Sequence, residues 1–106
     1  MKNKKQVGKA LGRVASGLYV VTAKCEDKED AVLASWVNQC SFDPPAVTIA
    51  LGTLRAARLL VEGSGAFIVN VLPKDDMTLL KHFSRPPEDI FKGVKTRKGF
   101  EGIRIL

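Results

Sequence analysis

The sequence has few of the residues from which most catalytic and metal sites are built. Its 106 residues include two cysteines and one histidine, so the usual ligand set of a zinc site is missing. Cys25 and Cys40 do not form a CxxC pair, and two cysteines are too few for a disulfide scaffold. The sequence has no GxGxxG motif, no P-loop and no metal motif. If the protein is an enzyme, we expect a cofactor rather than a side-chain nucleophile to carry the chemistry.

Long apolar runs are also missing. The longest apolar stretches are of strand length, too short to cross a bilayer. No apolar signal core or cleavage site follows the basic N-terminus. We therefore expect a cytoplasmic protein that does not bind membranes. With 45% hydrophobic and 26% charged residues, the composition is that of one globular domain spanning residues 1–106, with a basic extension at residues 1–10.

Positive charge is concentrated near the two ends of the chain, which has a net charge of +6. The basic residues there are Lys2, Lys4, Lys5, Lys9 and Arg13 at one end and Lys92, Lys95, Arg97, Lys98 and Arg104 at the other. Such clusters can contact nucleic-acid phosphates, but no aromatic residues are interleaved with them. We therefore do not expect nucleic acid as a partner. The charges are either solvated or attract anionic small molecules such as phosphorylated cofactors.

The residue pattern predicts a mainly β, antiparallel fold with a few short helices. Strands are expected at residues 18–23, 31–40, 46–51 and 66–72, with another beginning at 103–106. Helices are expected at residues 3–13 and 54–62 and around Met77 to Phe83, with Asn3, Thr53, and Asp75 or Asp76 as N-caps. Cys40 is expected to be a small buried side chain. Since the chain stops within the strand pattern, we expect a missing C-terminal portion, a partner chain, or both to cover the open sheet edges.

The segment LASW, from Leu33 to Trp36, and the nearby Ser41 are the first candidate site. Small side chains let a planar ligand approach the backbone, and hydroxyls can hold a ribityl chain or a phosphate. A small residue at a tight strand crossing explains Ser35 equally well. Trp36 is a core aromatic unless it lines a pocket.

Three further segments are weaker candidates. In GTLRAAR, Thr53 and Arg55 stand at a predicted helix start that would attract phosphate, although a threonine cap needs no ligand. Asn70 is a polar residue within the apolar strand FIVNVL and either bonds to nearby backbone or lines a polar pocket. His82 has no obvious carboxylate or nucleophile as a partner, which argues against a catalytic triad.

Four motifs in this order resemble the flavin reductase-like family: SGLYVVTA, LASWVNQCSFDPPAVTIAL, GAFIVNVL and LLKHFS followed by IFKGV. The resemblance spans about Leu11 to Val94 and extends most clearly to the C-terminal flavin reductase module of cyanobacterial diflavin (flavodiiron) proteins. It implies an antiparallel FMN-binding split barrel, which in this chain would be C-terminally incomplete. It also implies a homodimer, with flavodiiron or flavodoxin modules as further partners.

The resemblance also implies a cofactor and a set of contacts. FMN, or FAD, would be bound, and NAD(P)H would pass hydride to the flavin, with no catalytic side chain and no metal. The implied flavin contacts are Leu33, Ala34, Ser35, Trp36, Ser41, Phe42, Thr53, Arg55, Asn70, His82, Phe83 and Ser84. Within that set, Thr53 and Arg55 would meet the phosphate, and the His82 to Ser84 segment would lie near the nicotinamide.

Three other hypotheses remain open on the sequence alone. The domain could bind flavin for electron transfer without reductase activity, or be a truncated split-barrel fragment that only dimerises. It could also be a basic nucleic-acid-binding barrel. Flavin retention without NAD(P)H oxidation would favour the electron-transfer domain. A folded protein that binds no flavin would favour the fragment, and salt-dependent oligonucleotide binding would favour the nucleic-acid-binding barrel.

Overall fold

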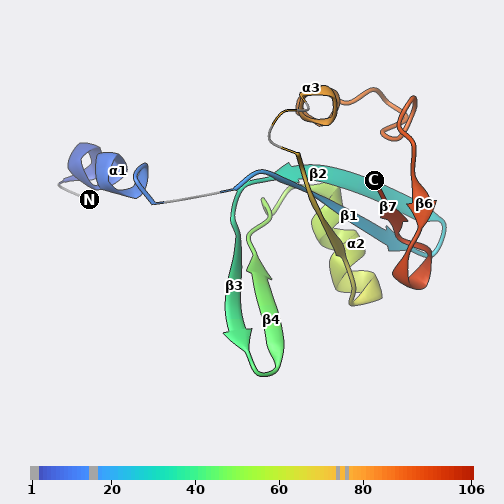
Figure 1. The fold of residues 1–106 in the computed structure, drawn as a ribbon, viewed down its shortest axis with the longest axis horizontal. Coiled ribbons are helices and arrows are strands. Elements are labelled where there is room, and N and C mark those ends of the chain that lie inside the picture. The colour runs from blue at the N-terminus through green and yellow to red at the C-terminus, as the bar shows by residue number, and fades with distance from the viewer. Residues whose placement is uncertain (1–2, 15–16, 74, 76) are drawn as a thin grey trace.

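The computed structural model describes residues 3–14, 17–73, 75 and 77–106. Within these residues, three α-helices and seven strands follow one another (Figure 1). In order they are α1 (Lys4–Leu11), β1 (Tyr19–Cys25), β2 (Lys28–Ala34), β3 (Val37–Phe42), β4 (Pro45–Ile49), α2 (Ala56–Ser64), β5 (Ile68–Val71), α3 (Thr78–Ser84), β6 (Arg97–Lys98), a 3-10 turn (Phe100–Gly102) and β7 (Arg104–Ile105).

A three-stranded antiparallel sheet in the order β2-β1-β5 forms the centre of the molecule. Residues 20–23 of β1 are fully buried because helices or loops cover both faces of this strand. On one face, Val21, Val32 and Ala34 pack with Ala57 of α2. The opposite face packs against a second cluster of Val20, Ala31, Phe83 of α3 and Phe91. Alternation along the strands therefore divides the core into two layers separated by the sheet.

The β3–β4 hairpin projects from this body (Figure 1). The single strand expected at residues 31–40 is wrong, because β2 ends at Ala34 and β3 begins at Val37. The chain leaves β1 at this break, and the Trp36 carbonyl accepts a hydrogen bond from the Ala50 amide at 3.0 Å. Cys40 is exposed, contrary to the prediction, since it lies on a two-stranded hairpin outside the core. The hairpin turns at a cis Asp43–Pro44 peptide, after which β4 starts at Pro45.

The helix positions are close to those predicted, but the predicted side-chain caps are wrong. Neither α1 after Asn3 nor α3 after Met77 has a side-chain cap hydrogen bond, and Asp76 lies outside the described residues. The N-cap of α2 is Arg55 in an extended conformation, so Thr53 does not cap this helix. At its other end Gly65 adopts φ 74°, and its amide donates to the Val61 carbonyl at 2.8 Å, as a glycine-terminated helix should.

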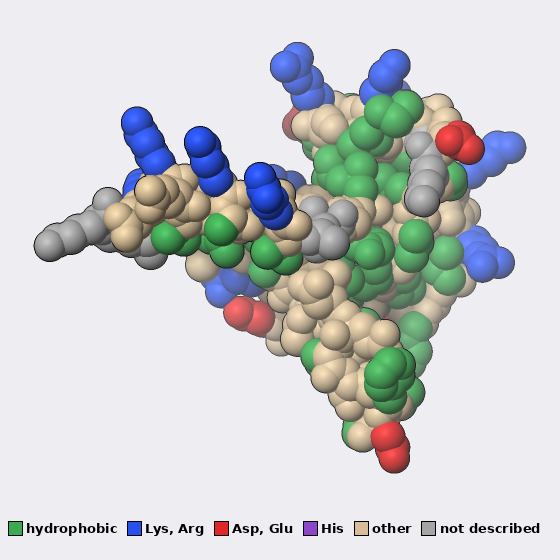
Figure 2. Space-filling view, turned by 60° about the vertical axis from the view of Figure 1, so that its left-hand side comes forward, with side chains coloured by type: hydrophobic (Ala, Val, Ile, Leu, Met, Phe, Trp, Pro, Cys, Tyr) green, Lys and Arg blue, Asp and Glu red, His purple; other side chains and the backbone are tan. Residues whose placement is uncertain are grey.

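Helix α1 extends away from the body and contains no buried residue (Figures 1 and 2). Lysine and arginine side chains stand out on one side of this part of the chain, while apolar side chains lie along another (Figure 2). None of the helices in the described part of the chain is long and apolar enough to cross a membrane.

The fold is mainly β with three short helices, but the described residues form no closed barrel. The strands form three sheets that share no strand: the three-stranded sheet, the β3–β4 hairpin and a β6–β7 hairpin. The strand expected at 103–106 is present as β7, whereas its partner β6 falls in a segment where the sequence shows no period.

Candidate functional site

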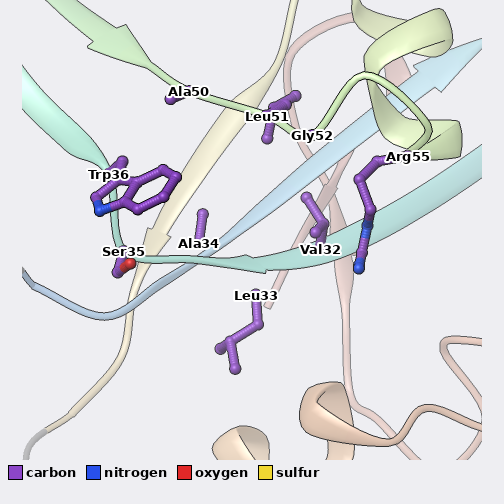
Figure 3. Close-up of a pocket in the computed structure, with 9 residues that line it drawn as sticks. All are labelled: Val32, Leu33, Ala34, Ser35, Trp36, Ala50, Leu51, Gly52 and Arg55. Atoms are coloured by element: carbon purple, nitrogen blue, oxygen red, sulfur yellow. The ribbon is translucent and has the colours of Figure 1, made fainter. Parts of the chain in front are cut away.

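A cavity of about 290 Å³ lies where β2 ends and where the segment after β4 turns toward α2 (Figure 3). Two stretches of sequence and one arginine form its walls. The lining residues are Val32, Leu33, Ala34, Ser35, Trp36, Ala50, Leu51, Gly52 and Arg55. The sequence predictions at LASW and at GTLRAAR therefore meet in one hollow.

Strand alternation determines which part of each β2 residue reaches the cavity. The side chains of Val32 and Ala34 point toward Leu51, whereas Leu33 points to the other face of the sheet (Figure 3). Leu33 accordingly packs against the core cluster that contains Phe83, and it contributes backbone rather than side chain to the cavity wall. The floor of the cavity, formed by Val32, Ala34 and Leu51, is therefore apolar.

Gly52 leaves the space in which the Arg55 side chain lies. A Cβ added at Gly52 would come within 3.2 Å of Arg55 Cγ, closer than most real contacts of this kind. Because the backbone at Gly52 carries no side chain, Arg55 extends along the cavity toward β2 (Figure 3).

Arg55 and Arg58 stand three positions apart but have different surroundings. Arg58 donates to Glu62 Oε1 through Nη1 and to the Thr53 carbonyl through Nε, both at 2.9 Å. Among the described residues, no side-chain hydrogen bond or ion pair engages Arg55. An unpaired guanidinium beside the free N–H groups of a helix start is suited to an anion such as phosphate.

Trp36 and Ser35 form the other side of the cavity. Ser35 is half-buried at the break between β2 and β3, and the Trp36 side chain, at 68% exposed, leans over the hollow (Figure 3). A large exposed aromatic beside an apolar floor can stack on a planar ring.

Ser41, Phe42 and Thr53 do not line this cavity. Ser41 and Phe42 pair with Ala46 and Pro45 at the far end of the hairpin, and Phe42 is 85% exposed. Thr53 directly follows Gly52, and its carbonyl is occupied by Arg58.

Asn70 lies across the sheet from the cavity and is almost fully buried. Its Nδ2 donates to the Val20 carbonyl at 2.9 Å and to Thr22 Oγ1 at 3.2 Å, and its Oδ1 accepts from the Leu106 amide at 3.0 Å. The structure shows the bonding to nearby backbone, and Asn70 also lines a separate cavity of about 370 Å³ between β5, Leu79 and Leu106.

The His82 to Ser84 segment lies on the same face as Asn70. His82 Nε2 is 2.7 Å from the Ile90 carbonyl, Phe83 is in the core, and Ser84 Oγ donates to the Leu80 carbonyl at 2.6 Å. The contact of these residues and of Asn70 with a ligand stays a prediction.

Val32, Ala50, Leu51 and Gly52 line the cavity although no ligand contact was predicted at them. Gly52 could have been predicted as a ligand contact from the sequence, since a glycine between a strand and a helix lets a ligand approach the backbone closely. The other three are apolar residues of predicted strands or their ends, indistinguishable in sequence from core positions.

Comparisons with known proteins identify the family of the chain. The model of the flavin reductase like domain matches residues 11–106. Diflavin flavoprotein A 1 of Synechocystis is 41% identical over 102 residues, covering 92% of this chain and 18% of the relative. A putative diflavin flavoprotein A 3 of Nostoc is 44% identical with the same coverage. The chain thus spans less than a fifth of these relatives' length.

Solved structures share the fold. Nitrilotriacetate monooxygenase component B of Mycobacterium thermoresistibile superposes with a TM-score of 0.83 at 23% identity, covering 98% of this chain and 58% of that one. A putative flavin reductase of Haemophilus somnus gives 0.80 at 22% identity, covering 96% and 67%. From the domain match and the relatives together, the chain belongs to the family of flavin reductase like domains.

Proposed function

We propose that the domain binds FMN in the cavity between β2 and the start of α2 and transfers hydride from NAD(P)H to it. The observation that carries this proposal is the shared hollow of Ser35, Trp36 and Arg55, which combines a stacking aromatic, small neighbours and an unpaired cation. The family supports a flavin as the ligand. We propose FMN rather than FAD because the cavity contains one arginine without a side-chain partner, which matches the single phosphate group of FMN.

The residues present fit such a ligand in two places. Arg55 and the amides at the start of α2 would hold the phosphate, and the space left by Gly52 keeps the arginine at the cavity wall. Ala34 and Ala50 leave one side of the hollow open to a flat ring, with Trp36 against its edge or face. A volume of about 290 Å³ is at the small end for ligand pockets, so part of the ligand would protrude from this cavity.

A bound flavin supplies the redox chemistry, since its ring accepts a hydride. The protein's own contribution is positional: Arg55 fixes one end of the ligand, and the β2 backbone and Trp36 orient the ring and exclude water from one side. No lining residue is a histidine or a carboxylate, and the proposed transfer requires neither as a general acid or base.

A second copy of the chain would cover the protruding part, as the proposed homodimeric split barrel requires. The hairpin carries exposed Phe42 and Val47, and β5 is an unpaired edge of the central sheet among the described residues. An isolated two-stranded hairpin is marginally stable in water, so a partner surface would stabilise it.

The names of the relatives suggest a wider setting. We propose that the domain works with further flavin-containing modules, in the same chain or in another one, as the resemblance to the diflavin proteins implies.

Two successive measurements test the function. FMN is first titrated into the protein and followed by the change in flavin absorbance. NADH or NADPH is then added to the complex under anaerobic conditions, and bleaching of the flavin absorbance is expected. Retention of FMN with no bleaching by either nucleotide would instead favour an electron-transfer module, and failure of a folded chain to bind flavin would refute the proposal.

A further inference from the structure

A second cavity, of about 410 Å³, lies between the β1–β2 turn and the β6–β7 hairpin. Its walls are mostly charged, in contrast to the apolar floor beneath Trp36. The residues that line this basic cavity are Lys24, Glu29, Thr96, Arg97, Lys98, Gly102 and Arg104. Its volume is within the range of small-molecule sites.

The basic cavity and the proposed flavin site are separate. Glu29 and Ala34 are five residues apart on β2, which corresponds to about 17 Å of strand. Lys24 of β1 is paired with Glu29 of β2, as Val20 is with Leu33. By strand alternation both pairs lie on the same face of the sheet, the one that α3 covers. Val32 and Ala34 belong to the face that α2 covers. The two cavities thus lie at opposite ends and on opposite faces of the sheet.

Arg104 neutralises the one carboxylate in the basic cavity. Its Nε donates to both oxygens of Glu29, at 3.0 and 3.1 Å, and its guanidinium stacks 4.9 Å from the centre of the Phe91 ring. Lys24 stands directly opposite Glu29 in the strand register, yet the two form no ion pair within 4.0 Å. Glu29 is therefore committed to Arg104, and Lys24 is left without its expected partner.

Three cations remain uncompensated as a result. Within the described ranges, Lys24, Arg97 and Lys98 form no side-chain hydrogen bond or ion pair. Gly102 has φ 78°, and a Cβ there would lie 3.3 Å from Lys24 Nζ, so the absence of a side chain leaves room for this ammonium group. The like charges of Lys24 and Lys98 at this hollow, with Arg97 next to Lys98 on β6, raise the local concentration of anions.

Thr96 adds a neutral donor. Its Oγ1 accepts a hydrogen bond from Arg104 Nη1 at 2.7 Å. A hydroxyl group that accepts one bond still has its own proton to donate. The cavity thus offers a hydroxyl donor together with ammonium and guanidinium donors that have no partner among the described residues, which suits an oxyanion.

From this arrangement we infer that the basic cavity is a second ligand site, which binds a small anion carrying two linked phosphate groups. A single phosphate monoester carries about −1.5 to −2 charges at pH 7, so two phosphates match three free cations better than one. The ligand would bridge Lys24 on the central sheet and Lys98 on β6 and thereby connect the C-terminal hairpin to the body.

Inorganic pyrophosphate is the probe that tests the inference, by calorimetric titration and by amide NMR of the full chain at physiological ionic strength. Lys98→Gln removes one cavity cation at an exposed position, and Lys92→Gln is the matched control outside the cavity. We expect pyrophosphate to shift the amide signals of Lys98 and Gly102. We also expect Lys98→Gln to weaken binding about tenfold and Lys92→Gln to leave it unchanged.

Three results would overturn the inference: no pyrophosphate binding, equal weakening in both lysine variants, or signal shifts confined to Ser35 and Gly52. The Arg55→Ala variant separates the two sites, since pyrophosphate binding should persist in it. FMN titration of Lys98→Gln should match that of the unmodified chain, so failure of one site leaves the test of the other intact.

Discussion

Asn70 and Leu106 are joined by a 3.0 Å hydrogen bond from the Leu106 backbone amide to Asn70 Oδ1. This bond connects the central sheet to the end of the described chain, and the Asn70 amide group also contacts Val20 and Thr22. A single buried side chain thus holds together β5, β1 and the segment after β7.

Asn70→Ala should therefore destabilise the fold. The variant loses three hydrogen bonds and leaves the Leu106 amide without its acceptor, whereas the Thr22 hydroxyl still donates to the Arg104 carbonyl. The free energy of unfolding should fall by about 2 to 3 kcal/mol. Urea denaturation measures this. Asn38→Ala, at an exposed position of β3, is the control and should change it by less than about 0.5 kcal/mol. Lost FMN affinity at unchanged stability would instead identify Asn70 as a ligand contact.

Gly52→Ala should weaken FMN binding with little loss of stability. The new Cβ would lie 3.2 Å from Arg55 Cγ and displace this side chain from the cavity wall. A cost of about 1 kcal/mol corresponds to an affinity about fivefold lower in an absorbance titration. Gly8→Ala introduces a methyl group with nothing within 4 Å and should leave the affinity unchanged. Equal affinities in both variants would show that the space at Gly52 is irrelevant to binding.

Thr53→Ala should change the free energy of unfolding by less than about 0.5 kcal/mol, because α2 has no side-chain cap. A genuine threonine N-cap typically contributes about 1 kcal/mol. Thermal or urea denaturation distinguishes these values. A loss of 1 kcal/mol or more would restore Thr53 as the cap.

Phe42→Ser should weaken self-association in sedimentation experiments, since the proposed homodimer buries this 85% exposed side chain. The variant removes little from the monomer, whose core lies elsewhere. Lys81→Ser, an exposed position on α3, is the control. An unchanged monomer–dimer equilibrium in both variants would contradict a role of the hairpin tip in dimerisation.

The apolar pattern was sufficient to locate β1, α2 and the strand around Asn70, because local periodicity and a terminal glycine determine them. The break at Ser35 and Trp36 could not be located from the sequence, since LASWVNQC continues as one strand in pattern, and only pairing with β1 and then β4 divides it. Thr53 failed as a cap for a similar reason: the structure starts the helix two residues later, at a position that no cap residue marks.

The sequence predicted part of the candidate site, namely the residues at the ends of strands and helices. Ser35, Trp36 and Arg55 lie at element ends, where sequence signals for close approach and for anions are readable. The sheet face on which Asn70 and the His82 segment would lie depends on strand register, and that register is a long-range property.

The most direct test of the account is FMN titration of the unmodified chain beside Arg55→Ala and Arg58→Ala. Both variants remove one positive charge from α2 or its N-cap, but Arg58 is engaged by Glu62 and Thr53, whereas Arg55 lines the cavity. We predict saturable binding to the unmodified chain, affinity about tenfold lower in Arg55→Ala, and unchanged affinity in Arg58→Ala. Equal FMN affinity in all three proteins would contradict the proposed site.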